Sequence, residues 1–277
     1  MVMNRSNVAV INTDKPLAGT KRALASIHAS QYFQKDERIL IKPNYVTNDL
    51  PYTGVTTDPL VILGVVEYFQ DSGFENIIIA EGGSTDFDTM ETFQKVGLTD
   101  MVRDVELIDL NRDERVEVTI PNATKLKKVN VAKTFFECDA IVSVAKLKVH
   151  NLATVTLNMK NMMGGILPKS IMHKDIHEKI VDLNKRFMPR LGVIDGIMGC
   201  QTHETARDPV RSNVIVAGND IVATDAVGAF LMGIDPHDVK YLELAAKEGI
   251  GTNDLDQIEV VGDDIKKLQK RYRRANL

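Results

Sequence analysis

The chain contains few of the residues that form several common classes of site. Its 277 residues include two cysteines and no tryptophan, and aromatic residues make up 5% of the total. Cys138 and Cys200 are far apart and lack the paired spacing of a zinc site, a redox disulfide or an iron–sulfur cluster. We therefore expect no self-ligated iron–sulfur cluster, and the natural setting for such a chain is a reducing cytoplasm.

Long hydrophobic runs and a strong charge of one sign are also absent. The N-terminus lacks the apolar core of a signal peptide, and no stretch approaches the roughly 20 apolar residues of a membrane span, so we expect no membrane contact. The net charge of -4 argues against nucleic acid as a partner. The basic residues at 266–274 predict a solvated terminal helix. With 44% hydrophobic and 26% charged residues, the chain is expected to be globular.

Short β-branched runs alternate with helical patterns along most of the chain. Such runs occur at residues 7–11, 38–41 and 76–80, and Asp58 with Pro59 marks the start of a helix that stops near Gly73. This alternation predicts one α/β domain over residues 1–277, with a mainly parallel, Rossmann-like central sheet flanked by helices. The alternating pattern at about 105–135 predicts a small antiparallel β insertion.

A row of donors follows the apolar run at residues 140–145, which has the pattern of a buried strand. In an extended chain Lys146, Lys148 and His150 project to one face. Because open parallel sheets bind ligands beyond the carboxyl ends of their strands, we predict a site for an anionic small molecule here. We assign Lys146 and His150 as catalytic candidates and Lys148 as a substrate-binding one.

Two other strand ends carry candidate groups. Lys42 and Asn44 flank a proline after the second strand and are predicted to bind substrate. Glu81 is a third catalytic candidate, and Gly82, Gly83 and Ser84 follow it. Their backbone N–H groups are suited to an anion nest, although a tight turn that requires glycine is an equally good interpretation.

The segment after His150 is predicted to be a helix. Val155, Met159, Met162 and Ile166 fall on one stripe at helical spacing, which favours a core role for that stripe. The remaining polar and glycine positions are predicted to bind substrate, the glycines either by capping the helix or by admitting a ligand: Lys160, Asn161, Gly164 and Gly165.

Metal ligation is a further prediction. His173 and His177 have the i, i+4 spacing that chelates a metal from one helical face, although surface or hydrogen-bonding histidines are the commoner case. Asp195 and Asp225 are carboxylates at a strand end and a helix start. Together with His177 they are the candidate ligands of a divalent metal such as Mg²⁺.

These residues also carry a resemblance over nearly the whole chain. Seven collinear motifs look like those of the domain of unknown function family 362: Lys42-Pro43-Asn44, Thr57-Asp58-Pro59, Glu81-Gly82-Gly83-Ser84, Lys146-Leu147-Lys148-Val149-His150, Leu157-Asn158-Met159-Lys160-Asn161, Asp195-Gly196-Ile197 and Ala223-Thr224-Asp225-Ala226-Val227. Many members of that family carry an appended ferredoxin-like iron–sulfur domain. The resemblance implies functional roles for Asp58 and for the polar candidates above. Residues 199–205 depart from the family's usual loop.

A weaker similarity runs to the nickel-pincer lactate racemases, in their N-terminal domain. It rests on the strand-end loop with proline, the proline-started helix and the run Gly164-Gly165-Ile166-Leu167-Pro168. The histidine motif that characterises the racemases is absent. This similarity implies 2-hydroxy acid isomerisation as an alternative function.

The leading functional hypothesis is an enzyme that acts on a small anionic metabolite, either a carboxylate or a phosphate. The iron–sulfur association implies redox chemistry with a separate ferredoxin-like electron donor. A non-catalytic metabolite or cofactor-binding protein is the alternative from a different class. We expect the following residues to line one cleft: Lys42, Glu81, Lys146, His150 and Lys160.

Overall fold

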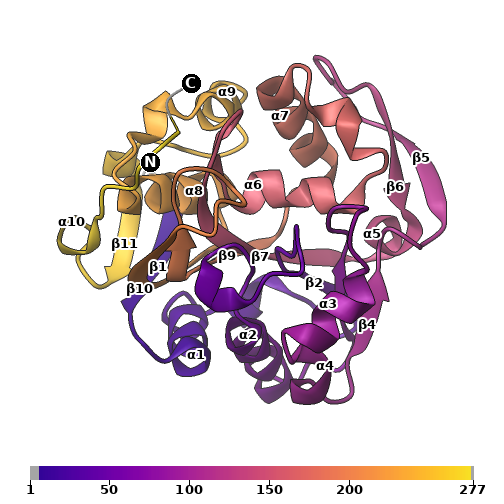
Figure 1. Cartoon of the computed structure of the whole chain (residues 1–277), viewed down its shortest axis with the longest axis horizontal. Helices are drawn as coiled ribbons and strands as arrows, with labels where there is room; N and C mark the ends of the chain where they lie inside the picture. Colours follow the sequence, from indigo (N-terminus) through magenta and orange to yellow (C-terminus); the bar gives the residue numbers. More distant parts are fainter. Residues whose placement is uncertain (1–5, 276–277) are drawn as a thin grey trace.

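The computed structural model describes residues 6–275 and contains a nine-stranded mixed sheet (Figure 1). The strand order is β11-β1-β10-β9-β7-β2-β3-β4, and β8 pairs with β7 outside this path. The strands are β1 (Ser6–Asn12), β2 (Ile39–Lys42), β3 (Ile77–Glu81), β4 (Glu106–Asp109), β7 (Ala140–His150), β8 (Thr154–Thr156), β9 (Leu191–Cys200), β10 (Pro209–Gly218) and β11 (Ile258–Gly262).

Most neighbouring strands in this sheet are parallel. The strands from β9 through β7, β2 and β3 to β4 all run in one direction, and β1 is parallel to β11. β10 is antiparallel to both of its neighbours, and β8 forms a hairpin with β7. Because β9, β7, β2, β3 and β4 are parallel, their carboxyl ends lie at one edge of the sheet.

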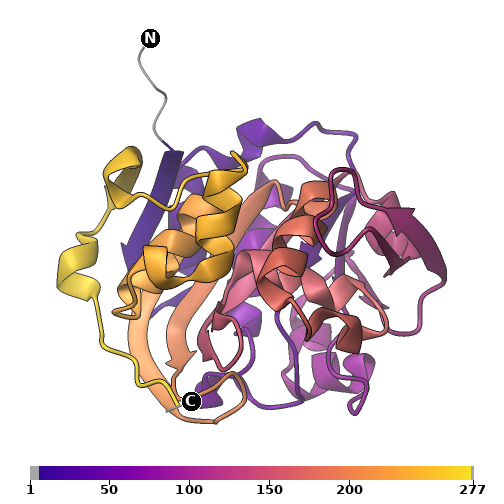
Figure 2. The ribbon, with the colours of Figure 1, turned by 90° about the horizontal axis from the view of Figure 1, so that it is seen from above.

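Helices cover both faces of the sheet. One face carries α1 (Pro16–Ser26), α2 (Pro59–Asp71), α3 (Thr89–Lys95) and α4 (Leu98–Met101). The other carries α6 (Asn158–Asn161), α7 (Ile176–Phe187), α8 (Ile221–Leu231) and α9 (Lys240–Lys247), which Figure 2 shows grouped together. The remaining short helices are α5 (Lys133–Glu137), α10 (Ile265–Leu268), η1 (Ala29–Tyr32), η2 (Pro51–Thr53), η3 (Met162–Gly165), η4 (Lys169–Met172), η5 (Pro236–Asp238) and η6 (Leu255–Gln257).

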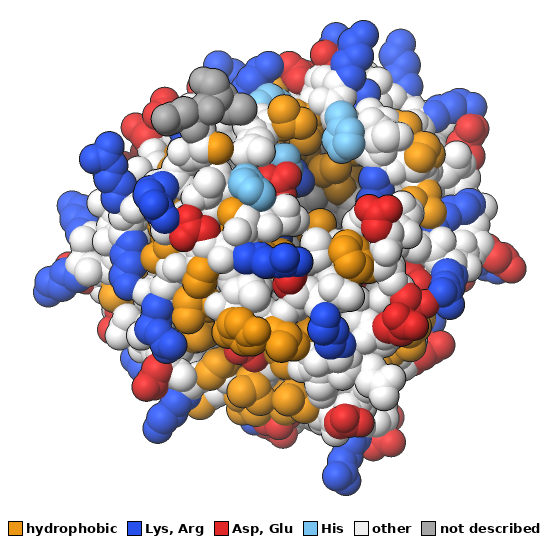
Figure 3. Space-filling view, in the orientation of Figure 1, with side chains coloured by type: hydrophobic (Ala, Val, Ile, Leu, Met, Phe, Trp, Pro, Cys, Tyr) orange, Lys and Arg blue, Asp and Glu red, His pale blue; other side chains and the backbone are white. Residues whose placement is uncertain are grey.

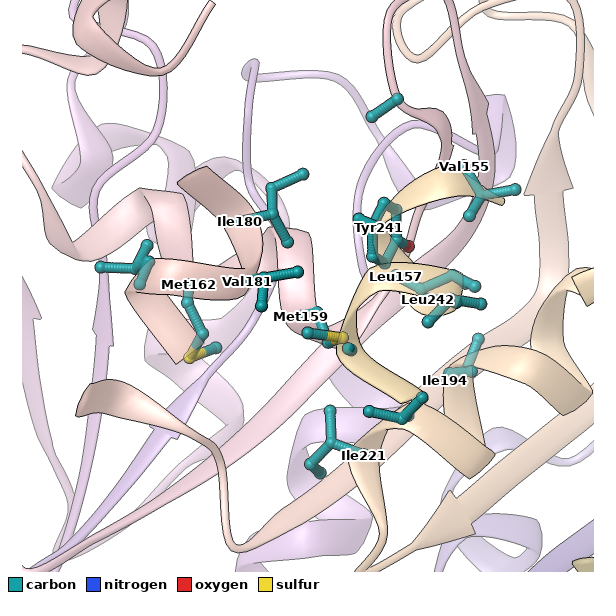
Figure 4. Packing of buried hydrophobic residues seen from close by; sticks show 14 of the residues in the cluster. Val155, Leu157, Met159, Met162, Ile180, Val181, Ile194, Ile221, Tyr241 and Leu242 are labelled. Atoms are coloured by element: carbon teal, nitrogen blue, oxygen red, sulfur yellow. The ribbon is translucent and has the colours of Figure 1, made fainter. Parts of the chain in front are cut away.

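Each face of the sheet has its own hydrophobic core. Along β7, Val142 and Val144 pack into the cluster with α1 and α2, whereas Leu147 and Val149 pack into the cluster with α6 to α9. The α6–α9 cluster surrounds Met159, which lies among side chains of α7, α8 and α9 in Figure 4. The strand's alternation therefore separates two apolar layers.

The structure confirms the α/β fold with a mostly parallel sheet and a small antiparallel pair. That pair consists of β5 (Arg115–Thr119) and β6 (Lys128–Ala132). The predicted insertion at 105–135 was too long at its start, because β4 belongs to the main sheet and pairs in parallel with β3. The start of α2 is as predicted, since Asp58 accepts a hydrogen bond from the backbone N–H of Leu60 and Pro59 is the first helical residue.

Two predicted helices are much shorter than expected. After His150 the chain turns back as β8, whose β-branched residues pair with β7, and only then forms α6 and η3. The four apolar residues of the predicted stripe are nevertheless all buried, as their core interpretation requires. The terminal helix ends at Leu268, and the chain beyond it packs along the protein, with Tyr272 buried.

None of the helices within residues 6–275 is long and apolar enough to cross a membrane.

Candidate functional site

A pocket of about 430 Å³ lies at the carboxyl ends of β2, β3 and β7. The space-filling view shows a hollow in this face, with histidine side chains at its rim (Figure 3). Ten of the residues predicted to form the site line it: Lys42, Asn44, Glu81, Gly82, Gly83, Ser84, His150, Lys160, Asn161 and Gly164. The parallel strands thus bring together groups that are spread over more than a hundred positions of the sequence.

A buried ion pair joins β2 to β3 beside this pocket. Lys42 Nζ lies 2.8 Å from Glu81 Oε1, and both side chains are almost completely buried. Lys42 Nζ also donates to Asn161 Oδ1, and Glu81 accepts from the backbone N–H groups of Tyr45 and Gly82. Burial lowers the pKa of Lys42, and the negative charge of Glu81 opposes that shift. The two charges cancel, and both side chains have further hydrogen-bond partners. The pair therefore contributes little net charge to the pocket.

The glycines beside this pair have a packing role. A Cβ at Gly82 would lie 2.4 Å from the carbonyl oxygen of Gly164, and a Cβ at Gly164 would lie 2.4 Å from Glu81 Oε1. A Cβ at Gly83 would lie 2.1 Å from the carbonyl oxygen of Tyr45. Any side chain at these positions would displace a neighbouring backbone or the ion pair.

The predicted N–H nest is largely used within the protein. The Gly82 N–H donates to Glu81 Oε1, and the Ser84 N–H donates to the carbonyl oxygen of Val46. Gly165 does not line the pocket, because it packs against the ring of Phe135, which a Cβ would approach to 2.7 Å. The tight-turn interpretation of the glycine loop therefore fits the structure better than the nest.

Lys146 does not line the pocket, so the prediction that it shares the cleft was wrong. Its Nζ lies 2.7 Å from Asp195 Oδ2, and both side chains are fully buried. Asp195 also accepts hydrogen bonds from the backbone N–H groups of Asp58 and Ile197. This second ion pair joins β7, β9 and the start of α2.

Lys148 likewise lies outside the pocket lining. Its buried Nζ donates to the carbonyl oxygen of Val55 at 2.8 Å, and burial lowers the pKa of Lys148 to about 7. Strand alternation places Lys146 and Lys148 on the side of the sheet that residues 55–58 cover. Both lysines hold the segment before α2 in position, a role that their spacing alone does not distinguish from ligand binding.

His150 faces the pocket as a neutral imidazole. Its Nδ1 accepts hydrogen bonds from the backbone N–H groups of Leu152 and Ala153, at 3.0 and 3.1 Å. Burial, together with the nearby ammonium groups of Lys160 and Lys148, lowers the pKa of His150 to about 2. The ring proton must therefore lie on Nε2, which is 3.5 Å from Glu204 Oε1. His150 is a hydrogen-bond donor in this state.

The sequence does not predict a role for Glu204, although residues 199–205 depart from the family's usual loop. It lines the pocket from the loop after β9, and its side chain is 27% exposed. Asp208 holds this loop by accepting from Thr202 Oγ1 and from Arg273, while the Thr202 N–H donates to the carbonyl oxygen of Arg273. The C-terminal segment thus fixes the loop that carries Glu204. The position of this loop after the carboxyl end of β9 is the sequence signal that could have identified Glu204.

Two partly buried lysines supply positive charge to the pocket. Among residues 6–275, Lys160 Nζ has no hydrogen-bond or ion-pair partner, whereas Lys169 Nζ donates to Asn111 Oδ1 and to the carbonyl oxygen of Ile166. Burial lowers the pKa of each lysine to about 8. Lys169 was not among the predicted residues, because a lysine after a proline carries no distinctive sequence signal.

Asp225 positions the pocket residues of α6. Its carboxylate accepts from the backbone N–H groups of Asn158 and Met159 and from Asn158 Nδ2. It therefore caps the short helix that carries Lys160 and Asn161. Burial raises the pKa of Asp225 to about 7, and these donors oppose the shift.

The three predicted metal ligands are not brought together. Asp195 is paired with Lys146, Asp225 caps α6, and His177 stacks on Tyr241 with ring centroids 6.5 Å apart. His173 lines the pocket, but α7 begins only at Ile176, so His173 and His177 do not share a helical face. Within residues 6–275 no group of three His, Cys, Asp or Glu side chains is arranged to hold a metal ion.

We expect Lys146→Met to destabilise the protein, because it leaves the buried Asp195 carboxylate without its counter-charge. The free energy of unfolding, measured with urea, should fall by about 3–5 kcal/mol. The double variant Lys146→Met/Asp195→Asn removes that charge and should recover more than about 1 kcal/mol of the loss. The exposed Lys95→Met is the control. A loss below about 1 kcal/mol in the single variant would contradict a tightly coupled pair.

We expect His150 to stay neutral, with its proton on Nε2, from pH 5 to pH 8. Its folded-state pKa lies far below that range, so its ring ¹⁵N shifts should not titrate there. The exposed His237, whose pKa is raised by its hydrogen bond to Glu243, should titrate above 6.5 in the same spectra. His150→Gln assigns the signals. Titration of His150 within this range would show that the donor assignment is wrong.

Comparisons with known proteins agree with this architecture. The chain is 25% identical over 235 residues to the thylakoid-associated protein sll1697 of Synechocystis sp., covering 80% of this chain and 70% of that protein. Its structure resembles that of the lactate racemase apoprotein from Thermoanaerobacterium thermosaccharolyticum with a TM-score of 0.55 and 13% identity. This match covers 83% of the present chain but only 57% of the racemase chain, and at that identity it shows the fold alone. The family model described as "Domain of unknown function (DUF362)" matches residues 39–230, and the chain belongs to this family.

Proposed function

We propose that this protein is an enzyme that binds a small carboxylic acid in the pocket and transfers a proton to and from it. One observation carries the proposal. An unpartnered ammonium group, a neutral imidazole N–H and a partly buried carboxylate line the same pocket, on Lys160, His150 and Glu204. These groups match the needs of anion binding and general acid–base chemistry.

Lys160 is the group best suited to hold the substrate's carboxylate. Its charge is partly buried, and an isolated buried charge is costly until an opposite charge approaches it. Lys42 lies nearby but is already neutralised by Glu81. Lys160 is therefore the main anchor for this carboxylate, since Lys169 Nζ already donates to Asn111 Oδ1 and to the carbonyl oxygen of Ile166.

Glu204 and His150 would divide the proton chemistry between them. Nδ1 of His150 is occupied by two backbone donors and Nε2 already carries a proton, so His150 is a donor and not a base. The carboxylate of Glu204 would accept a proton from the carbon beside the substrate's carboxylate. The electron pair left on that carbon delocalises onto the carboxylate oxygens, where the His150 N–H and the Lys160 ammonium stabilise it. Return of the proton completes an exchange or an isomerisation.

A 2-hydroxy acid isomerisation is the second candidate. The observation that favours it is that two imidazoles, those of His150 and His173, line one pocket. In this version Glu204 would remove the proton of C2 and a protonated His173 would supply one to the opposite face, while Lys160 binds the carboxylate. The described residues provide no three-ligand cluster for a metal, so neither version contains a step through a metal ion. Redox chemistry with a ferredoxin-like donor stays a prediction of the family resemblance.

We expect the affinity for a carboxylate to fall as the pH rises through about 8. Lys160 binds an anion only when protonated, and its pKa of about 8 lies below the ordinary 10.5, so the charge is present below pH 8 and lost above it. Calorimetric titration with lactate should show affinity falling about tenfold between pH 7 and pH 9.5.

Lys160→Met should weaken binding roughly tenfold to a hundredfold at pH 7 and flatten the pH dependence, whereas Lys95→Met should change neither. Equal affinity of Lys160→Met and the wild type at low and moderate salt would show that Lys160 is structural.

We expect the protein to catalyse exchange of the α-hydrogen of a small acid with solvent. The assay is proton NMR in D₂O with a panel of 2-hydroxy, 2-amino and unsubstituted acids of three to six carbons. Glu204→Gln should lower the exchange rate at least about a hundredfold while changing affinity less than about threefold, because the amide cannot accept the proton. Binding without exchange by the wild type, for every acid tested, would instead identify a non-catalytic binding protein.

A further inference from the structure

The two pocket lysines are anchored over different strands. Lys160 precedes Asn161, which bonds to Ser143 of β7 and to Lys42 at the end of β2. Lys169 bonds to Asn111, which follows β4 at the edge of the sheet. Since the strand order is β7-β2-β3-β4, these anchors lie over different strands, and we place the two ammonium groups toward different ends of the pocket.

The region between the two lysines has no net charge. It contains the Lys42–Glu81 pair, against which the backbone of Gly164 packs. The charged neighbours of each lysine agree with this arrangement, in which the ion pair lies between Lys160 and Lys169. Lys160 interacts with Glu204 and Lys42, whereas Lys169 interacts with Glu81, Lys42 and Asp109. The pocket therefore has an ammonium group near each end, with the Glu204 carboxylate on the side of Lys160, and an ion pair without net charge between them.

We infer that the substrate is a dicarboxylic acid whose two carboxylates bind to Lys160 and Lys169, an inference that rests on the proposed function. A volume of about 430 Å³ is generous for a three-carbon acid but suits a longer one. Each ammonium group gains most from an anion of its own, because its charge is partly withdrawn from water.

Carboxylates fit this pocket better than phosphates. Phosphate sites commonly use a nest of backbone N–H groups or bidentate arginines. Here the N–H groups of Gly82 and Ser84 are bonded within the protein, and no arginine is among the described residues that line the pocket.

The spacing of the strands suggests the length of the acid. Asn161 bonds to Lys42 at the end of β2 and Lys169 to Asn111 after β4, so these anchors are two strand intervals, roughly 10 Å, apart. Each ammonium–carboxylate contact takes up about 3 Å of that span. Roughly 4 Å is left between the two carboxylates. This corresponds to four or five carbons, as in succinate or glutarate.

Calorimetry at pH 7 and constant ionic strength tests the inference with two series of probes. One is the dicarboxylates from malonate to adipate, and the other is the monocarboxylates of equal carbon number. We expect affinity to peak at succinate or glutarate, at least tenfold above the matching monocarboxylate. Lys169→Met should remove the peak while changing monocarboxylate affinity less than threefold. Lys169→Arg, which keeps the charge, should retain the peak, and Lys95→Met should behave as the wild type.

The results separate this inference from the proposed function. Dicarboxylates that bind no tighter than monocarboxylates, or a peak that survives in a folded Lys169→Met, would overturn the two-carboxylate inference. Monocarboxylate binding that is lost in Lys160→Met would still support the proposed function in that case. Should Lys169→Met fail to fold, a missing peak in the folded Lys169→Arg overturns the inference. Failure of both series to bind the wild type would overturn both proposals.

Discussion

The buried ion pair between Lys42 and Glu81 is the interaction around which the site is organised. Two charges withdrawn from water are stable only when further hydrogen bonds satisfy them. Asn161 and the backbone N–H groups of Tyr45 and Gly82 meet this need, and they bring α6, the loop after β2 and the loop after β3 to one place. The absence of a side chain at Gly164 follows from the same constraint, because a Cβ there would collide with the pair.

A second buried pair supports the neighbouring strands. Lys146 and Asp195 link β7 to β9, and Asp195 also holds the first turn of α2 through the N–H of Asp58. The lysines of this region are thus divided between two tasks. Lys42 and Lys146 are neutralised inside the structure, whereas Lys160 and Lys169 keep charges that a ligand can use. Burial lowers the pKa of Lys160 and of Lys169 to about 8, and the nearby charge of Lys42 contributes to both shifts.

The proton chemistry that we propose for His150 and Glu204 depends on backbone geometry. The β7–β8 hairpin directs two N–H groups at Nδ1 of His150, which leaves only Nε2 to carry the proton. The loop after β9 places Glu204 opposite that proton, and the C-terminal segment holds the loop through Asp208. A histidine and a glutamate that are 54 positions apart therefore form a donor and an acceptor facing one cavity.

The sequence by itself determined the class of fold, the parallel strands and most of the residues at their carboxyl ends. It could do so because β-branched runs, helix caps and the period of two along a strand are local properties. It could not determine which strand-end lysines would be paired. That depends on partners far along the chain, such as Asp195 for Lys146 and Glu81 for Lys42. The hairpin after His150, the capping role of Asp225 and the entry of Glu204 and Lys169 into the pocket also required the tertiary structure. Each of these features results from contacts between segments that are far apart in the sequence and share no local pattern. Only the folded chain therefore decides which polar groups stay unpaired and accessible to a ligand.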